Sequence, residues 1–235
     1  MSPVYNRAKE KSWKGLGKAI MDDIILASAS PRRRELMALL GLNFRVLAAG
    51  VDENDTHTTS PEELACRLSQ EKARAVAGQV SHGIIVAADT IVALGHTLLG
   101  KPASVAEARQ MLCALRGRQH RVISAITVVR RPEGDEITDW ADTLVQMRDY
   151  TDEEIEAYIA SGDPMDKAGA YAIQHSGFRP VARVEGCYAN VVGLPLCHLY
   201  RALQSMGVSD ARSPVAACRV LTGYACEFYG RLLKE

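Results

Sequence analysis

A cluster of hydroxyl and guanidinium groups stands where a short apolar segment gives way to a helix. Ser28, Ser30, Arg32 and Arg33 fall within the run S-A-S-P-R-R. Serine followed by proline is a typical helix start, so free backbone N–H groups meet these side chains. Such a place attracts phosphate groups. An ordinary helix cap with two solvated arginines explains the spacing equally well, and the run has neither of the common glycine-rich nucleotide motifs.

Two carboxylate positions could handle a proton or a metal ion. Asp89 follows five apolar residues, and we expect it at the carboxyl end of a central strand, where open α/β sheets present ligand groups. A carboxylate there is costly unless it is paired or used, although a turn cap beside Thr90 is the alternative. Glu53, in the run V-D-E, could provide oxygen ligands to Mg²⁺ or Mn²⁺, but composition alone favours a solvated acidic loop.

Three lysines could complete a phosphate site. Lys101 follows a predicted hairpin that could return it toward Asp89. Lys72 lies on a predicted helix, where a charged face is the default. Without further context, Lys101 would be a solvated turn lysine and Lys72 part of a solvated helix face. Lys167 lies with two carboxylates in a glycine-rich loop that leads to Gln174, and small residues there allow close backbone approach.

A framework of alternating strands and helices must position these residues. Apolar runs predict strands at 24–27, 84–88, 120–130, 137–148 and 181–184, with a hairpin around Gly95. Capping residues predict helices that begin at Ser30, Ser60, Ser104, Thr151 and Pro195. This alternation with one antiparallel pair indicates an α/β or α+β domain built on a mixed sheet.

The charge balance limits the class of partner. The chain of 235 residues is 47% hydrophobic and carries 28 basic and 28 acidic side chains. It has no overall field to hold it on DNA or on an anionic membrane, so we expect neither as a partner. Asp22 and Asp23 interrupt the apolar run after the basic start, which is not typical of a signal peptide, and no run reaches membrane-spanning length.

The cysteines indicate the compartment. The six cysteines form no C-x-x-C pair, which argues against a zinc site and favours a reducing compartment. We therefore expect a cytoplasmic protein. Composition divides the chain into a basic N-terminal extension at 1–20, a main domain at 21–206 and a C-terminal extension at 207–235 that could form one more helix.

Eight short motifs, taken in order, resemble those of the Maf family of nucleotide pyrophosphatases. They are S-A-S-P-R-R-R-E-L at 28–36, V-D-E at 51–53, E-K-A at 71–73, A-D-T at 88–90, G-K-P at 100–102, G-R-Q-H-R-V at 117–122, S-G-D-P-M-D-K-A-G-A-Y-A-I-Q at 161–174 and E-G-C-Y-A-N-V-V-G-L-P-L at 185–196. Each motif is weak alone, but the ordered set across residues 24–206 is specific. The resemblance implies a two-lobed fold like that of inosine triphosphatases, with a cleft between the lobes.

The resemblance also implies a reaction, namely hydrolysis of the bond between the α and β phosphates of a nucleoside triphosphate with a divalent cation, Mg²⁺ or Mn²⁺. Matched by motif, Asp89 is the catalytic acid–base residue and, with Glu53, a metal ligand. The matched phosphate contacts are Ser28, Ser30, Arg33, Lys72, Lys101 and Lys167.

Three residues imply which nucleotide base the enzyme would accept. Arg32, Thr90 and Gln174 match the branch of the family that acts on dTTP and UTP. The branch resembling 7-methylguanosine triphosphate pyrophosphatases has tryptophan, glutamine and glutamate in those places. Two departures concern substrate range. His175 stands where the pyrimidine branch more often has glycine, and could narrow the pocket or change selectivity; Ser124 and the following alanine stand where many members have Thr-Gly.

Three functions therefore remain open at this stage. The first is hydrolysis of dTTP and UTP, with modified pyrimidine nucleotides included, as a house-cleaning step before polymerases use them. The second is the same reaction on 7-methyl-GTP or another nucleotide. The third is a nucleotide-binding regulator of cell division and septum formation. A proton acceptor beside the phosphates favours an enzyme over a passive sensor. By analogy with the family, a homodimer is expected.

Overall fold

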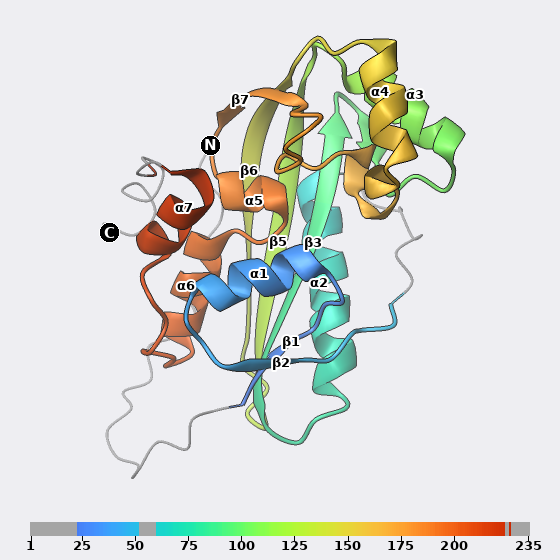
Figure 1. The fold of residues 1–235 in the computed structure, drawn as a ribbon. Coiled ribbons are helices and arrows are strands. Elements are labelled where there is room, and N and C mark those ends of the chain that lie inside the picture. The colour runs from blue at the N-terminus through green and yellow to red at the C-terminus, as the bar shows by residue number, and fades with distance from the viewer. Residues whose placement is uncertain (1–22, 52–59, 224–225, 227–235) are drawn as a thin grey trace.

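A mixed β-sheet forms the centre of the molecule in the computed structural model, which describes residues 23–51, 60–223 and 226 (Figure 1). Within that part of the chain the sheet has seven strands in the order β2-β1-β3-β5-β6-β7, with β4 paired to β3 outside this path. β1 is parallel to β2 and β3, and the other pairs are antiparallel. The strands are β1 (Ile24–Leu26), β2 (Phe44–Val46), β3 (Gly83–Leu94), β4 (Thr97–Leu99), β5 (Gln119–Arg131), β6 (Glu136–Met147) and β7 (Val181–Glu185).

Most helices begin where capping residues predict them. Ser30, Ser60, Ser104 and Thr151 each accept a hydrogen bond from the backbone N–H three residues later, which satisfies a group that the first turn leaves unpaired. The helices are α1 (Pro31–Leu39), α2 (Pro61–Ala77), α3 (Val105–Leu115), α4 (Asp152–Ala160), α5 (Tyr188–Val192), α6 (Leu196–Ser205) and α7 (Pro214–Thr222), with 3₁₀ turns η1 (Asp163–Asp166) and η2 (Ala168–Ala170). α5 and the 3₁₀ turns were not predicted.

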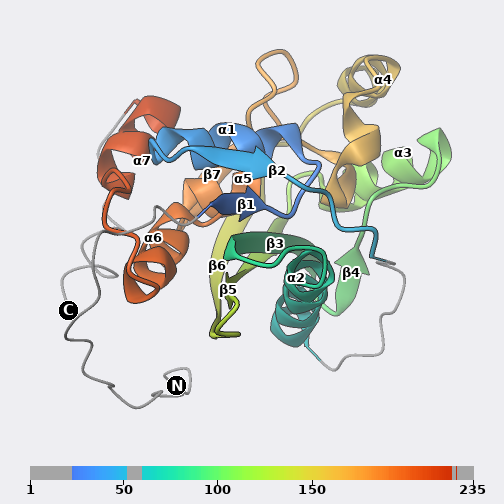
Figure 2. The ribbon, with the colours of Figure 1, turned by 90° about the horizontal axis from the view of Figure 1, so that it is seen from below.

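Helices cover both faces of the parallel part of the sheet. Figure 2 shows α2 on one side and α1, α5, α6 and α7 on the other. Ile25 and Ile85 pack in the cluster with α2, whereas Ile24 and Ile84 pack in the cluster on the opposite face. Successive residues of a strand point to opposite faces, so a doubly covered strand is apolar throughout. This arrangement confirms the predicted α/β mixed-sheet class.

A separate apolar cluster occupies the other end of the long strands. Val92, Val122 and Val145, from β3, β5 and β6, pack there against α3 and α4, with Leu112 and Tyr158 among the contacts. Two lobes with different cores therefore share one continuous sheet, and this agrees with the two-lobed fold that the family resemblance implies.

Asp89 does not lie at the end of a strand, and that prediction was wrong. β3 continues through Asp89 and Thr90 to Leu94. Asp89 stands opposite Ala125 on β5. On the other edge, β1 pairs with β3 only as far as Val86, and β4 pairs with it only from Val92. Among the described strands, none lies along this edge of β3 between Val86 and Val92, so Asp89 and Thr90 mark a gap at one edge of β3 rather than its end.

The C-terminal extension contributes to the main core. α7 buries Ala217 and Cys218 in the cluster that contains α1, α5 and α6.

The N-terminal extension and Glu53 lie outside the described residues. No helix in the described part of the chain is long and apolar enough to cross a membrane.

Candidate active site

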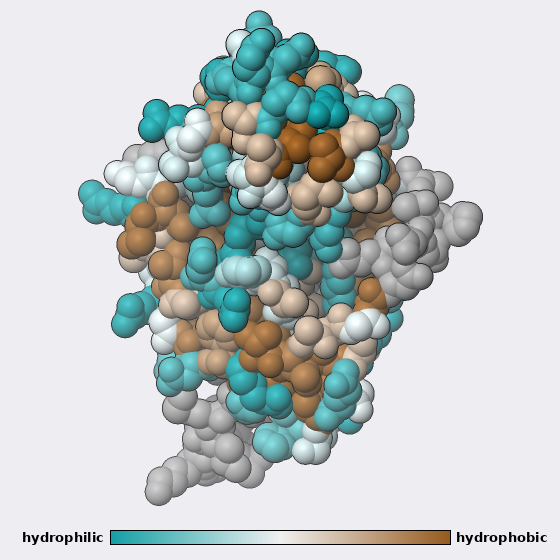
Figure 3. Space-filling model, turned by 45° about the vertical axis from the view of Figure 1, so that its right-hand side comes forward, coloured by the Kyte–Doolittle hydropathy of each residue, from teal (hydrophilic) through white to brown (hydrophobic). Residues whose placement is uncertain are grey.

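A cavity of about 770 Å³ opens at the gap beside β3, between the two lobes. Figure 3 shows hydrophilic side chains gathered in a hollow across the middle of the molecule. The cavity brings together all the predicted site residues that the structure describes, which are Ser28, Ser30, Arg32, Arg33, Lys72, Asp89, Thr90, Lys101, Lys167 and Gln174. Since they come from segments far apart in the sequence, the fold positions them as one site.

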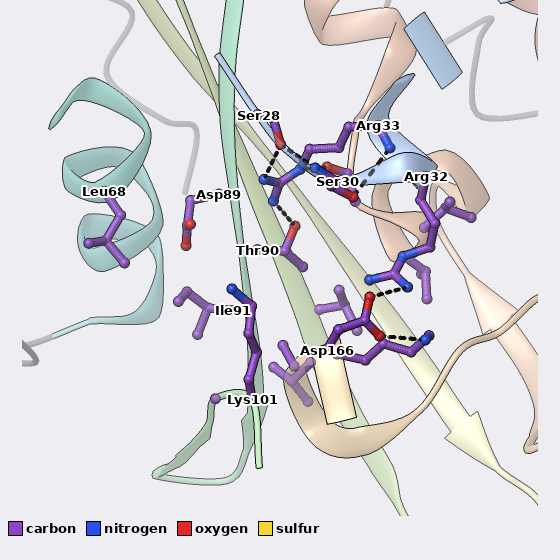
Figure 4. A pocket seen from close by; sticks show the side chains of 18 of the residues that line it. Ser28, Ser30, Arg32, Arg33, Leu68, Asp89, Thr90, Ile91, Lys101 and Asp166 are labelled. Atoms are coloured by element: carbon purple, nitrogen blue, oxygen red, sulfur yellow. Dashed lines mark hydrogen bonds and ion pairs between the residues drawn. The ribbon is translucent and has the colours of Figure 1, made fainter. Parts of the chain in front are cut away.

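Asp89 and Lys72 form a buried ion pair at the bottom of this cavity. Lys72 Nζ donates to Asp89 Oδ1, and the two residues are 7% and 6% exposed. Asp89 projects from β3 toward α2, which carries Lys72 (Figure 4). A buried charge needs a partner, so each side chain makes the other tolerable here. The sequence predicted that Lys72 contacts phosphate. In the structure its ammonium group is bound to the Asp89 carboxylate.

Arg33 is fixed on the other side of β3 by three different elements. Its Nε donates to the Gly193 carbonyl at 2.9 Å, Nη1 to Ser28 Oγ at 3.4 Å and Nη2 to Thr90 Oγ1 at 3.2 Å. Gly193 has φ +121°, and a Cβ there would lie 3.5 Å from Thr90 Oγ1. Gly193 is therefore required for its backbone conformation, whereas a Cβ there would make only an ordinary contact. We call Lys72, Asp89, Arg33 and Thr90 the floor of the cavity.

Two residues outside the predicted set support the floor. Thr90 Oγ1 and Ser124 Oγ are 2.8 Å apart, and Ser124 Oγ donates to the Asn190 carbonyl at 3.0 Å. Asn190 is fully buried, and its Nδ2 donates to the Val122 carbonyl and to Thr143 Oγ1, both at 2.8 Å. Asn190 and Gly193 both lie in the motif at 185–196, and this motif was the sequence signal that could have identified them. The sequence analysis assigned neither residue a role.

The mouth of the cavity carries a second set of ion pairs. Lys167 Nζ donates to Asp163 Oδ1 at 3.0 Å and to Asp166 Oδ1 at 2.7 Å. Arg32 Nη1 lies 3.6 Å from Asp166 Oδ2, from the opposite side of the mouth (Figure 4). Burial works to raise the pKa of Asp163 and Asp166, but hydrogen bonds and the Lys167 ammonium lower both pKa values overall. We call Arg32, Asp166, Lys167 and Gln174 the rim.

A neutral histidine supports one wall. Tyr171 lines the cavity, and its hydroxyl is 2.8 Å from His120 Nε2. His120 is 2% exposed, and burial lowers its pKa to about 4, so the ring stays uncharged near neutral pH.

The lining has a local excess of positive charge in a chain that has none overall. Five basic side chains face two carboxylates, namely Arg32, Arg33, Lys72, Lys101 and Lys167 against Asp89 and Asp166. The cavity is therefore suited to a multiply charged anion, because low-dielectric walls focus the field of these cations.

The donor set also suits a divalent cation held jointly with a phosphorylated ligand. No group of three or more potential ligands among the described residues could hold a metal ion alone. Lys72 occupies Asp89 Oδ1, whereas Asp89 Oδ2 has no hydrogen-bond partner within the described chain. Mg²⁺ commonly binds through one or two carboxylates plus substrate phosphates, so this oxygen fits such an ion.

Comparison with known proteins gives a consistent result. The family model described as "Maf-like protein" matches residues 23–206. A relative from Moorella thermoacetica is 46% identical over 188 residues, which are 80% of this chain and 97% of the relative. Relatives from Thermomicrobium roseum, 49% identical over 187 residues, and Methanosarcina barkeri, 46% over 190 residues, cover 78% and 80% of this chain and 84% and 96% of their own. All three carry the name dTTP/UTP pyrophosphatase.

Proposed function

The chain belongs to the Maf-like protein family, and we propose that it hydrolyses dTTP and UTP to the monophosphate and pyrophosphate. The observation that carries the proposal is the buried Asp89 at the bottom of a cavity whose lining is otherwise mainly cationic. An anion-binding module needs the cations, but a carboxylate among them weakens anion binding unless it takes part in chemistry.

The floor provides the chemistry. Asp89 accepts the proton of the attacking water, while Lys72 holds the carboxylate through Oδ1. Arg33, the Ser28 and Ser30 hydroxyls and Lys101 bind phosphate oxygens and stabilise the charge that develops as the α–β bond breaks. We propose that Lys167 joins them when the triphosphate competes with Asp163 and Asp166.

Asp89 and Glu53 are the residues proposed to hold Mg²⁺ or Mn²⁺. When bound, the ion neutralises phosphate charge and polarises the phosphoryl group.

Base choice is proposed for Arg32, Thr90 and Gln174. Arg32 and Gln174 line the mouth and are proposed to contact the base directly, whereas Thr90 lies on the floor, in contact with Arg33, and is proposed to act on base choice indirectly. A base near the mouth leaves the triphosphate beside the floor, where the proton acceptor lies.

Several wider expectations also remain proposals. We propose that the protein works in a reducing cytoplasm, which suits its six free cysteines. By analogy with the family, we also propose that it forms a homodimer. We retain the division into 1–20, 21–206 and 207–235, and a role in removing excess or non-canonical pyrimidine nucleotides. Nucleic acid and membranes are not proposed as partners.

The test is pyrophosphate release from dTTP, UTP, CTP and 7-methyl-GTP with Mg²⁺ or Mn²⁺, for the wild type and an Asp89→Asn variant. Turnover of dTTP and UTP that the variant loses supports the proposal. Preferred turnover of 7-methyl-GTP would move the protein to the other branch. Nucleotide binding without any turnover by the wild type would favour a regulatory protein.

A further inference from the structure

A second compartment opens beside the main cavity, next to the residues proposed to read the base. Its volume is about 320 Å³. Arg32, Lys167, Ala172 and Gln174 line both spaces. The lining is completed by Asp163, His175 and Ser176. We call this space the side compartment. A ligand that reaches Arg32 and Gln174 from the floor therefore arrives next to His175.

His175 is held in place before any ligand binds. Its Nδ1 accepts a hydrogen bond from the Phe178 N–H at 2.8 Å. Its ring meets the Tyr158 ring edge-on, with 4.7 Å between centroids, and Tyr158 in turn stacks on Phe178 at 4.4 Å. The Tyr158 hydroxyl donates to Asp163 Oδ2 at 2.7 Å and accepts from the Ala172 N–H at 3.0 Å. The imidazole is thus fixed by a backbone bond on one side and by a buried tyrosine on the other.

One polar atom of this ring remains available to a ligand. Because Nδ1 accepts from a backbone amide, the neutral ring carries its proton on Nε2. Within the described chain Nε2 has no hydrogen-bond partner. His175 therefore offers a fixed N–H donor at the side compartment, and a fixed donor discriminates between ligands because little ordering is needed when it binds.

Pyrimidines differ at one position in a way that such a donor can detect. Uracil and thymine carry a carbonyl oxygen at C4, which accepts hydrogen bonds, whereas cytosine carries an amino group, which donates them. An N–H facing the amino group leaves two donors opposed and unpaired, and unpaired polar groups give strong discrimination.

We propose that His175 is a specificity-determining residue that donates from Nε2 to the C4 carbonyl of uracil or thymine and disfavours cytosine. The proposal rests on the function proposed above. It assigns a role to a side chain that stands where the pyrimidine branch more often has glycine, so it concerns selectivity that this chain adds to that of Arg32, Thr90 and Gln174.

Two isosteric variants separate this role from a purely structural one. His175→Asn keeps an acceptor where Nδ1 accepts from Phe178 but removes the nitrogen at the Nε2 position. His175→Gln places an amide donor near the Nε2 position but lacks the acceptor for Phe178. The matched control is His82→Asn, the same change at an exposed histidine that lines neither cavity. The measurements are kcat/KM for UTP and for CTP, and the melting temperature.

We expect the wild type to prefer UTP. In His175→Asn the UTP-to-CTP ratio of kcat/KM should fall about tenfold, as expected for one lost hydrogen bond, with a melting temperature close to that of the wild type. His175→Gln should keep most of the ratio and melt at a lower temperature. His82→Asn should change neither quantity.

Two results would overturn the inference. A wild type that does not discriminate UTP from CTP removes its basis. A His175→Asn variant with an unchanged ratio shows that His175 only caps the turn, and the proposed hydrolysis then stands without it. If the wild type hydrolyses neither nucleotide, the affinities for the α,β-imido analogues of UTP and CTP, measured by calorimetry, decide the role of His175 separately. Equal wild-type affinities, or a ratio unchanged in His175→Asn, would again reject it.

Discussion

The floor and the rim of the cavity both contain a lysine paired with carboxylate, but in different surroundings. On the floor, Lys72 and Asp89 are both buried, and each comes from the middle of a long regular element. At the rim, Lys167 is buried but the Asp166 side chain is 62% exposed, and both lie in or beside a short 3₁₀ turn. A buried pair on rigid elements keeps its geometry, whereas a pair whose carboxylate is exposed on a short turn exchanges partners at less cost. The floor is therefore suited to chemistry and the rim to admitting and selecting the ligand.

Removal of the floor carboxylate should have the largest effect. Asp89→Asn keeps the shape of the side chain but cannot accept a proton, so kcat for UTP should fall about 10²- to 10⁴-fold. The measurement is steady-state pyrophosphate release, with calorimetric binding of α,β-imido-UTP to show that the site is still formed. A kcat within a few-fold of the wild type would mean that the proton leaves by another route, and the contrast between floor and rim would fail.

Removal of the floor lysine should mainly affect stability. Lys72→Met leaves Asp89 buried without its counter-ion, and the free energy of unfolding should fall by about 3–5 kcal/mol. Urea denaturation measures it. The double variant Lys72→Met/Asp89→Asn contains neither charge and should recover part of the loss. A single variant as stable as the wild type would show that water reaches Asp89 in solution.

The pH dependence of stability should separate the interior from the rim. The pKa of His120 is lowered from 6.5 to about 4, so its contribution is present above pH 6.5 and is lost as the pH falls toward 4. At 1.36 kcal/mol per pKa unit the loss is about 3 kcal/mol. The lowered pKa values of Asp163 and Asp166 act in the same direction but only below their usual value of 3.8.

Replacing His120 by phenylalanine should therefore flatten the stability curve between pH 6.5 and 4 and leave the region below pH 4 unchanged. Urea denaturation at half-unit steps of pH checks this. Because the two proteins share all other titratable groups, the difference between their stability curves reports the contribution of His120. Parallel curves for the two proteins would mean that His120 is protonated in the folded state.

Removal of the rim carboxylate should have the smallest effect. Asp166→Asn removes one negative charge from the cavity mouth and releases Arg32 and Lys167 for the triphosphate, so KM for UTP should fall about two- to fivefold, with kcat unchanged. Steady-state kinetics at low and high salt measure this, and high salt should reduce the difference. A large loss of kcat would mean that Asp166 takes part in the reaction itself, and the distinction between floor and rim would then fail.

Local signals could be predicted from the sequence, and long-range pairings could not. The starts of α1, α2, α3 and α4 depend on a capping side chain and a backbone group three residues away. α5 has only five residues and a cysteine as its N-cap, so its start gives no such signal. The position of Asp89 within β3 depends on where β1 and β4 stop, which no local pattern around Asp89 contains.

The same limit applies to the site. The motifs identified residues that line one cavity, but the partners within it depend on packing between elements. Lys72 meets Asp89 only because α2 runs along β3, and Arg33 reaches the Gly193 carbonyl across 160 positions of sequence. Asn190 donates to groups on β5 and β6, which are distant in the sequence. Its supporting role could therefore not be predicted from the residues next to it in the chain.

The continuous strands have a mechanical consequence for how the cleft works. β3 and β5 are paired without interruption from Gly83 opposite Arg131 to Ala93 opposite Arg121, and this ladder passes through both lobes. A hinge requires a few residues that can absorb a large change in φ and ψ, and a paired strand in the interior of a sheet cannot do so without losing hydrogen bonds. We therefore expect the spacing of the lobes to stay constant on ligand binding. The sheet should keep the width of the cleft constant, and adjustment to a ligand should be confined to the turn Asp163–Asp166 at the rim, where the Asp166 side chain is exposed.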